Sequence, residues 1–212
     1  APARRKCLFL RYQSQDIRDR FANASQEIVR DAASLALEDI AQAVKSSLGK
    51  RRIHKGQDLR GSAYQYIPYK QEELCYEVLY RIGRGIARAS GKQDLKLAIG
   101  KDVRIHSAYL QQALIDGLLS EGVNVVDIGA TYTTTPMVSS VVYSYDDLDG
   151  AVQVTASHND FSFNGVKFIW GKENMPEETI TRVLHLAATD DLSPTGKKGL
   201  VETRDYKPLY KQ

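Results

Sequence analysis

The sequence contains few of the residues from which disulfide-stabilised and metal-binding proteins are built. It has two cysteines, Cys7 and Cys75, and neither belongs to a paired motif, which excludes a disulfide framework and a cysteine metal site. Of the four histidines, His54, His106 and His185 share no metal-ligand spacing, so we interpret them as surface or packing residues. A reducing compartment is therefore expected.

Long apolar runs are absent as well. The sequence contains no stretch of about 18 apolar residues, which excludes a transmembrane helix. It also lacks internal repeats and low-complexity tracts. The hydrophobic fraction of 42% and the charged fraction of 26% are typical of a soluble globular protein, and 212 residues are enough for one large domain or for one domain with an appendage.

The net charge of +3 is unevenly distributed along the chain. Residues 1–57 contain 12 Lys or Arg against 6 Asp or Glu, whereas residues 58–212 contain 17 against 20. The basic excess fits contact with an anionic partner or membrane surface, and it equally fits a solvated basic helix and tail. We expect no nucleic-acid partner.

The compartment stays open at this point. The first residue is Ala, followed by a basic stretch, which fits the removal of a targeting peptide as well as a mere boundary in the sequence. The cytoplasm and, if the N-terminus is processed, a plastid or mitochondrion are the alternatives.

The N-terminal part of the chain is predicted to be a helical extension. Apolar residues recur at helical spacing between residues 14 and 48, after a candidate N-cap at Ser14. Residues 49–57 are bounded by glycines and rich in cations, which favours a linker, and Asp58-Leu59-Arg60-Gly61 favours a turn. We therefore divide the chain into a basic helical extension with linker, residues 1–56, and a domain, residues 57–212.

The remainder alternates between helical and strand patterns. Helices are predicted at residues 72–90, 107–121, 136–143 and 176–188, and strands at 95–99, 123–128, 150–156 and 166–170. The last two strands are too close in sequence for a crossover helix, so they are expected to pair as an antiparallel hairpin. The predicted fold is an α/β domain with a mixed, mostly parallel sheet flanked by helices. Ser157 would follow a buried strand, where reactive groups of such scaffolds commonly lie.

Five short motifs occur in a fixed order along this pattern. They are Asp58-Leu59-Arg60-Gly61, Gly100-Lys101-Asp102-Val103-Arg104, Thr134-Thr135-Pro136, Thr155-Ala156-Ser157-His158-Asn159 and Asn164-Gly165-Val166-Lys167-Phe168. In this order, from about residue 57 to 210, they resemble the first domain of the alpha-D-phosphohexomutases, which include phosphoglucomutases, phosphomannomutases and phosphoglucosamine mutases.

The resemblance implies a chemistry for the Ser157 loop. In the family the matching serine is phosphorylated and exchanges its phosphate with a hexose phosphate, using Mg²⁺ bound through that phosphate and a hexose 1,6-bisphosphate intermediate. Ser157 would thus be the phosphoryl carrier and, through its phosphate, the one metal contact in this chain. The positions implied to surround it are His158, Asn159, Arg60 and Lys167.

Further positions are expected to support the loop. Asn164 belongs to the motif behind Ser157, and Asp102 with Arg104 is interpreted as a structural ion pair beneath the reactive loop. Arg and Lys beside the serine suit phosphoryl transfer, which needs positioning and charge neutralisation.

The sequence departs from the family pattern in two ways. Asp160 stands where a proline commonly follows the asparagine, which puts a carboxylate three residues from Ser157. Nothing in the chain resembles the Asp-Gly-Asp-x-Asp metal loop, and the sugar-selecting and terminal phosphate-binding loops of the family's later domains have no counterpart either.

Two hypotheses follow, and the sequence leaves open whether this chain is active as an enzyme. The first is a catalytic-serine domain of a phosphohexomutase, incomplete alone, that acts on hexose phosphates. The second is an inactive phosphohexomutase-like domain that serves as a docking or structural subunit. Its protein partner would bind through the N-terminal helix or through the face that the other domains cover in the family.

Overall fold

The computed structural model describes residues 53–63, 73–129, 131–189, 191, 193 and 195–206. The chain divides into two units, residues 1–43 and 44–212, and every described residue belongs to the second. The helix predicted between residues 14 and 48 lies outside the described residues. Within the described ranges, no helix combines the length and the apolar character needed to cross a membrane.

The described residues form alternating strands and helices. In chain order these are β1 (His54–Lys55), β2 (Asp58–Ser62), α4 (Tyr76–Ser90), β3 (Lys96–Lys101), α5 (Ser107–Ser120), β4 (Asn124–Asp127), α6 (Thr135–Ser144), β5 (Gly150–Val154), β6 (Phe163–Trp170), β7 (Glu173–Asn174), α7 (Glu177–Thr189) and β8 (Val201–Thr203).

All of these strands join one sheet. Its order is β1-β2-β6-β5-β3-β4-β8, and β7 pairs with β6. Strands β5, β3, β4 and β8 are parallel neighbours, whereas β6 is antiparallel to both β5 and β2. Strand β2 therefore runs in the same direction as β5, and the mixed, mostly parallel sheet predicted from the sequence is confirmed. The β5–β6 hairpin is also antiparallel as predicted.

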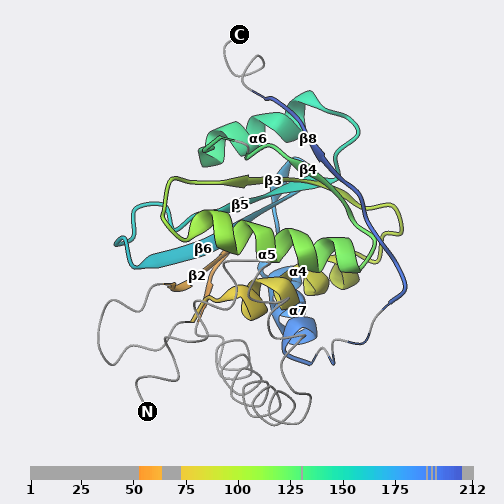
Figure 1. The fold of residues 1–212 in the computed structure, drawn as a ribbon, viewed down its shortest axis with the longest axis horizontal. Helices are drawn as coiled ribbons and strands as arrows, with labels where there is room; N and C mark the ends of the chain where they lie inside the picture. The colour runs from red at the N-terminus through yellow and green to blue at the C-terminus, as the bar shows by residue number, and fades with distance from the viewer. Residues whose placement is uncertain are drawn as a thin grey trace, which may run out of the picture. The chain divides into compact units, whose positions relative to one another are not determined.

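Helices cover the two faces of the sheet. Helix α6 lies on one face, and α4, α5 and α7 lie on the other (Figure 1). Beneath α6, the buried side chains of Val138, Val141 and Val142 pack against sheet residues that include Ala98 and Ala151. Burial of this apolar face is what holds α6 on the sheet.

Helices α4 and α5 approach each other at glycines. A Cβ atom on Gly117 would lie 2.1 Å from the carbonyl oxygen of Tyr80, and one on Gly83 would lie 2.5 Å from that of Leu114. Such distances are far below van der Waals contact, so these two positions accept only glycine at the observed separation of the helices.

The expectation for the segment before α4 is wrong. Asp58–Ser62 is not a turn but strand β2, and His54–Lys55, inside the predicted linker, pairs with it as β1. Asp and Gly have low strand propensity, but pairing with β6 and the full burial of Leu59 outweigh it. Where the extension ends and the domain begins stays a prediction.

The observed ends of the other predicted helices and strands lie within two residues of the predicted ones, except at the N-terminal ends of two elements. Helix α4 begins at Tyr76 instead of residue 72, and β6 begins at Phe163 instead of residue 166. Strand β6 is longer because its first residues pair with β2, a strand that the sequence pattern does not indicate.

We predict that Gly117→Ala lowers the free energy of unfolding by about 1–3 kcal/mol, because the added methyl forces α4 and α5 apart. Chemical denaturation monitored by circular dichroism measures this. The control is Gln112→Ala at an exposed position of the same helix, which should change stability by less than about 0.5 kcal/mol. Equal stability of the two variants would contradict the close packing.

Candidate active site

The candidate site lies where β3 and β5 end and β6 begins. Two loops meet there, residues 102–106 after β3 and residues 155–162 after β5. Ser157 has a φ of 55° and is the one non-glycine residue with positive φ among the described residues. Its side chain is exposed. A left-handed backbone at such a residue is costly and is common at functional sites.

Strands β2 and β6 bring two cations to the same edge. The Arg60 guanidinium donates to Asn159 Oδ1 at 3.2 Å and to Asp58 Oδ2 at 2.9 Å, and one of its nitrogens lies 3.4 Å from Ser157 Oγ. Lys167 Nζ lies 2.6 Å from the same Asp58 oxygen. Asp58 thus joins the two cations, since it is directly paired with Lys167 across β2 and β6, and Arg60 is the cation that reaches Ser157.

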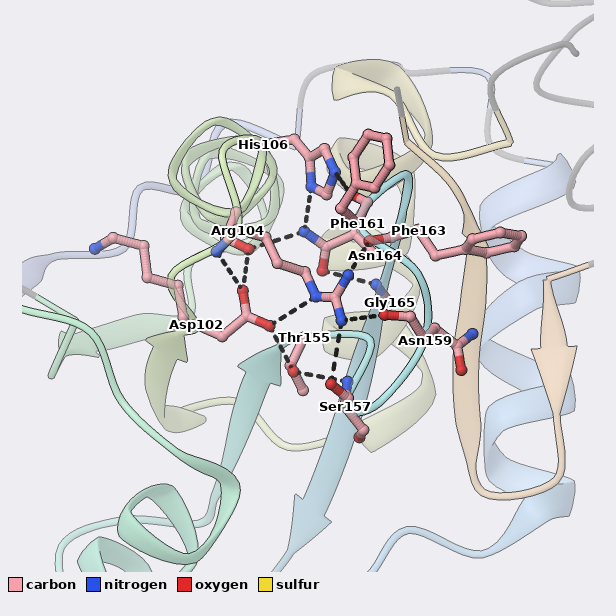
Figure 2. Close-up of polar contacts among 12 residues, drawn as sticks. Asp102, Arg104, His106, Thr155, Ser157, Asn159, Phe161, Phe163, Asn164 and Gly165 are labelled. Carbon is pink, nitrogen blue, oxygen red and sulfur yellow. Dashed lines mark hydrogen bonds and ion pairs between the residues drawn. The ribbon is translucent and has the colours of Figure 1, made fainter. Parts of the chain in front are cut away.

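Arg104 binds the backbone of the serine loop (Figure 2). Its Nη1 donates to the carbonyl oxygens of Asp160 at 2.6 Å and Phe163 at 3.1 Å. Its Nη2 donates to those of Ser157 at 3.1 Å and Asn159 at 2.7 Å. One guanidinium therefore joins three carbonyl groups of the serine loop and that of Phe163, the first residue of β6.

Asp102 holds the other side of this arrangement. Its carboxylate accepts from Arg104 Nε at 3.2 Å and from the Thr155 hydroxyl at 2.7 Å, and the Ser107 hydroxyl also donates to it. Thr155 Oγ1 in turn accepts from the backbone N–H of Ser157 at 3.0 Å. The expected Asp102–Arg104 ion pair is present beneath the loop.

Asn164 and His106 complete the support. Fully buried Asn164 donates to Ser107 Oγ at 2.8 Å and lies 2.7 Å from His106 Nδ1, while His106 Nε2 lies 3.0 Å from the Phe161 carbonyl oxygen. Since that carbonyl can only accept, Nε2 carries the proton and Nδ1 accepts from Asn164. Burial holds the pKa of His106 below its ordinary value, the nearby Arg104 guanidinium lowers it further, and the bond to the Phe161 carbonyl opposes the shift.

Two further residues of the serine loop are His158 and Asp160. The His158 side chain is exposed. Its ring takes part in none of the hydrogen bonds described above for this site. The Asp160 carboxylate accepts from the backbone N–H of Ser162 at 3.0 Å and from its hydroxyl at 2.9 Å. The carboxylate expected to crowd Ser157 is thus bound to Ser162.

Three residues make site contacts that the sequence analysis does not assign to them. They are Asp58, Thr155 and His106. Asp58 and Thr155 belong to the motifs, but their roles depend on a strand pairing and on a contact with Asp102. One of these contacts has a local sequence signal. Thr155 stands two residues before Ser157, and at that spacing a threonine hydroxyl can accept a hydrogen bond from the backbone N–H of the later residue.

The part of the chain that the structure describes does not form a metal site by itself. In the described ranges, no three residues among His, Cys, Asp and Glu lie so that they could bind a metal ion. The carboxylates near the serine are bound to Arg60 and Lys167, to Arg104, or to hydroxyl groups, and a Mg²⁺ ion prefers several free oxygen ligands.

We predict that the free energy of unfolding falls as the pH falls below about 6.5, the ordinary histidine pKa. The folded-state pKa of His106 is lowered, so the unfolded chain takes up this proton first and the folded state loses stability until the pH passes the folded pKa. Denaturant unfolding from pH 8 to 5 should show a shallower decline in His106→Gln. The exposed His185→Gln should keep the native slope; equal slopes in all three would contradict the prediction.

Comparisons with known proteins identify the family and the fold of the chain. Residues 51–193 match the family described as phosphoglucomutase/phosphomannomutase, alpha/beta/alpha domain I. Two solved structures, a phosphoglucomutase/phosphomannomutase family protein from Burkholderia thailandensis and a putative phosphomannomutase from Thermus thermophilus, have the same fold with TM-scores of 0.62 and 0.60. They are 23% and 22% identical over 74% of this chain, and the match covers 34% of each of them.

Curated relatives carry three related names. The phosphomannomutase of Vibrio cholerae serotype O1 is 37% identical over 54% of this chain, the phosphoglucomutase of Neisseria meningitidis serogroup B is 30% identical over 76%, and the phosphoglucosamine mutase of Limosilactobacillus reuteri is 33% identical over 64%. These matches cover 23%, 33% and 31% of the relatives, so the chain spans a third or less of their length. The chain belongs to the phosphoglucomutase/phosphomannomutase family and contains its first α/β/α domain.

Proposed function

We propose that Ser157 accepts and donates a phosphoryl group, so that this domain interconverts hexose 1- and 6-phosphates when the remaining parts of a mutase complete the site. The observation that carries the proposal is the exposed Ser157 hydroxyl, on a left-handed residue at the end of β5, with an Arg60 nitrogen 3.4 Å away. Phosphoryl transfer depends on such positioning and on charge neutralisation.

Each half of the reaction exchanges one bond. The bond between phosphorus and Ser157 Oγ breaks, a bond from phosphorus to a hydroxyl oxygen of the hexose monophosphate forms, and the proton of that hydroxyl is lost while Oγ gains one. The resulting hexose bisphosphate then returns its other phosphoryl group to Oγ by the reverse step. The net result is isomerisation of the hexose phosphate without consumption of a phosphate donor.

The cations beside the serine suit this exchange. Arg60 and Lys167 share the single carboxylate of Asp58, so the three side chains carry one excess positive charge, and the Arg60 guanidinium of this group lies near Oγ. Arg60 offers a planar donor fork to phosphate oxygens and Lys167 a point charge. We assign the exposed His158 and the amide of Asn159 to orientation of the loop and of the sugar.

The domain alone supplies one part of the cleft. We propose that Mg²⁺ contacts this chain only through phosphorylated Ser157, because the nearby carboxylates already have partners. The relatives' names point to glucose, mannose and glucosamine phosphates as candidate substrates.

A second candidate function is docking to another protein. Val103, Ile105 and Phe161 on the two site loops are 71%, 82% and 64% exposed. Exposed apolar side chains gathered on adjoining loops favour a protein-facing surface. The same face would receive the complementary domains if the chain is active, or a different partner if it is an inactive subunit.

We predict that the purified chain gains one phosphate when it is incubated with glucose 1,6-bisphosphate, or mannose 1,6-bisphosphate, in the presence of Mg²⁺ and the remaining domains of a related mutase. Intact-mass spectrometry measures the gain. Ser157→Ala should abolish it, while Ser144→Ala, an exposed serine on α6, should leave it unchanged. No phosphate on the native chain, together with stable binding of the added domains, would refute the mutase proposal in favour of docking.

We also predict that Arg60→Gln slows this phosphorylation by about 10- to 100-fold, since a hydrogen bond to a charged group is worth about 1.5–3 kcal/mol. Lys167 still neutralises Asp58 in this variant, so the fold should persist. Arg182→Gln on the exposed face of α7 is the matched control. A change in rate of less than about twofold would show that Arg60 does not contact the transferred phosphate.

A further inference from the structure

Contacts with other residues must stabilise the backbone conformation of Ser157. Its φ of 55° lies in the left-handed region, which a residue with a Cβ atom adopts only where the surroundings impose it. Glycine is the residue that adopts this conformation without cost, but glycine has no hydroxyl. A serine here therefore requires the neighbouring structure to hold it.

Both peptide groups that flank the Ser157 Cα atom are fixed from the loop after β3. The N–H of Ser157 donates to Thr155 Oγ1 at 3.0 Å, and that hydroxyl donates to Asp102 at 2.7 Å. The Ser157 carbonyl oxygen accepts from Arg104 at 3.1 Å. Since the peptide units are planar, fixing the direction of this N–H and this C=O determines φ and ψ between them.

The contacts of Arg104 with the rest of the loop prevent the strain from relaxing elsewhere. The same guanidinium holds the carbonyl groups of Asn159, Asp160 and Phe163, and its side chain is only 13% exposed. A loop held at four points by a planar, rigid donor cannot rotate one peptide group independently.

We propose that Arg104, together with Asp102, is a positioning residue that imposes the left-handed conformation of Ser157 and thereby directs Oγ toward Arg60. This goes beyond an ion pair that supports the loop, because it assigns the backbone angle of one residue to two specified contacts. The consequence for catalysis rests on the proposed function of Ser157. The statement that Arg104 and Asp102 impose the backbone angle of Ser157 does not depend on that function.

The first test uses melting temperature to measure the strain in the Ser157 backbone, without any measurement of activity. Ser157→Gly and Ser157→Ala are compared in the native background and in Arg104→Lys, which keeps a charge for Asp102 but cannot span four carbonyl groups. With Arg104 present, the glycine variant should melt about 2–4 °C above the alanine variant, since glycine relieves the left-handed strain. In Arg104→Lys this difference should fall by at least half, because the loop can relax. An unchanged difference in melting temperature overturns the inference.

A second pair of variants covers the case in which Arg104→Lys fails to fold. Thr155→Val removes the hydroxyl that holds the Ser157 N–H, whereas Thr155→Ser retains it. The glycine advantage at position 157 should shrink in the first and persist in the second. The same glycine advantage in both backgrounds overturns the inference.

The phosphorylation rate provides a further readout, in the presence of Mg²⁺ and the remaining domains of a related mutase. In Arg104→Lys the maximal rate should fall about tenfold or more, while the glucose 1,6-bisphosphate concentration at half-maximal rate stays unchanged, because Arg104 contacts the loop and not the ligand. The control is Arg81→Lys, an ion-paired arginine on α4 with 11% side-chain exposure. An equal loss of rate in both variants overturns the positioning role.

The two proposals fail in different ways. If the native chain gains no phosphate, the proposed function of Ser157 fails. The melting temperatures of Ser157→Gly and Ser157→Ala still decide whether Arg104 imposes the left-handed conformation at this position. If the chain gains phosphate but the melting difference is independent of Arg104, the proposed function stands and this inference fails.

Discussion

Carbonyl oxygens that point toward one another are stable only when a donor lies among them. Three carbonyl oxygens of the loop after β5 and that of Phe163 at the start of β6 accept from the guanidinium of Arg104. Charge-assisted bonds of this kind are about twice as strong as neutral ones. The Asp102 carboxylate keeps that guanidinium in place and reaches the Ser157 N–H through Thr155. The exposed hydroxyl, its backbone angle and its distance from Arg60 all depend on this arrangement.

The electrostatics of the site separate two tasks. One acidic group, Asp102, is bound to the cation that contacts the loop backbone, and another, Asp58, is shared by Lys167 and by Arg60, which lies near the serine hydroxyl. The carboxylate of Asp160 is satisfied by Ser162. Each negative charge near the loop therefore has a partner, which leaves positive charge facing the hydroxyl.

Much of the fold could be predicted from the sequence because periodicity and glycine stops are local signals. Helix α5 and the β5–β6 hairpin appear where the apolar pattern predicts them. Strand β2 could not be predicted, since five residues with Asp, Arg and Gly among them become a strand only by pairing with β6. In the site, the motifs single out Ser157, Arg60 and Lys167 as candidates, and the structure places Arg60 near Ser157. No sequence pattern indicates that Arg104 contacts carbonyl groups, because those acceptors exist at every position of any chain.

The order of the strands has a consequence for how the chain folds. Ser157 comes from the parallel half of the sheet and Arg60 from the antiparallel half, and the hydrogen-bonded pairs Arg60–Ser157 and Arg104–Ser157 are 97 and 53 positions apart in sequence. Contacts of such high sequence separation form late, since loop closure must precede them. The Phe163 carbonyl and the pairing of β2 with β6 both belong to this arrangement, so the serine loop reaches the described geometry only after β6 has paired with β2 and β5.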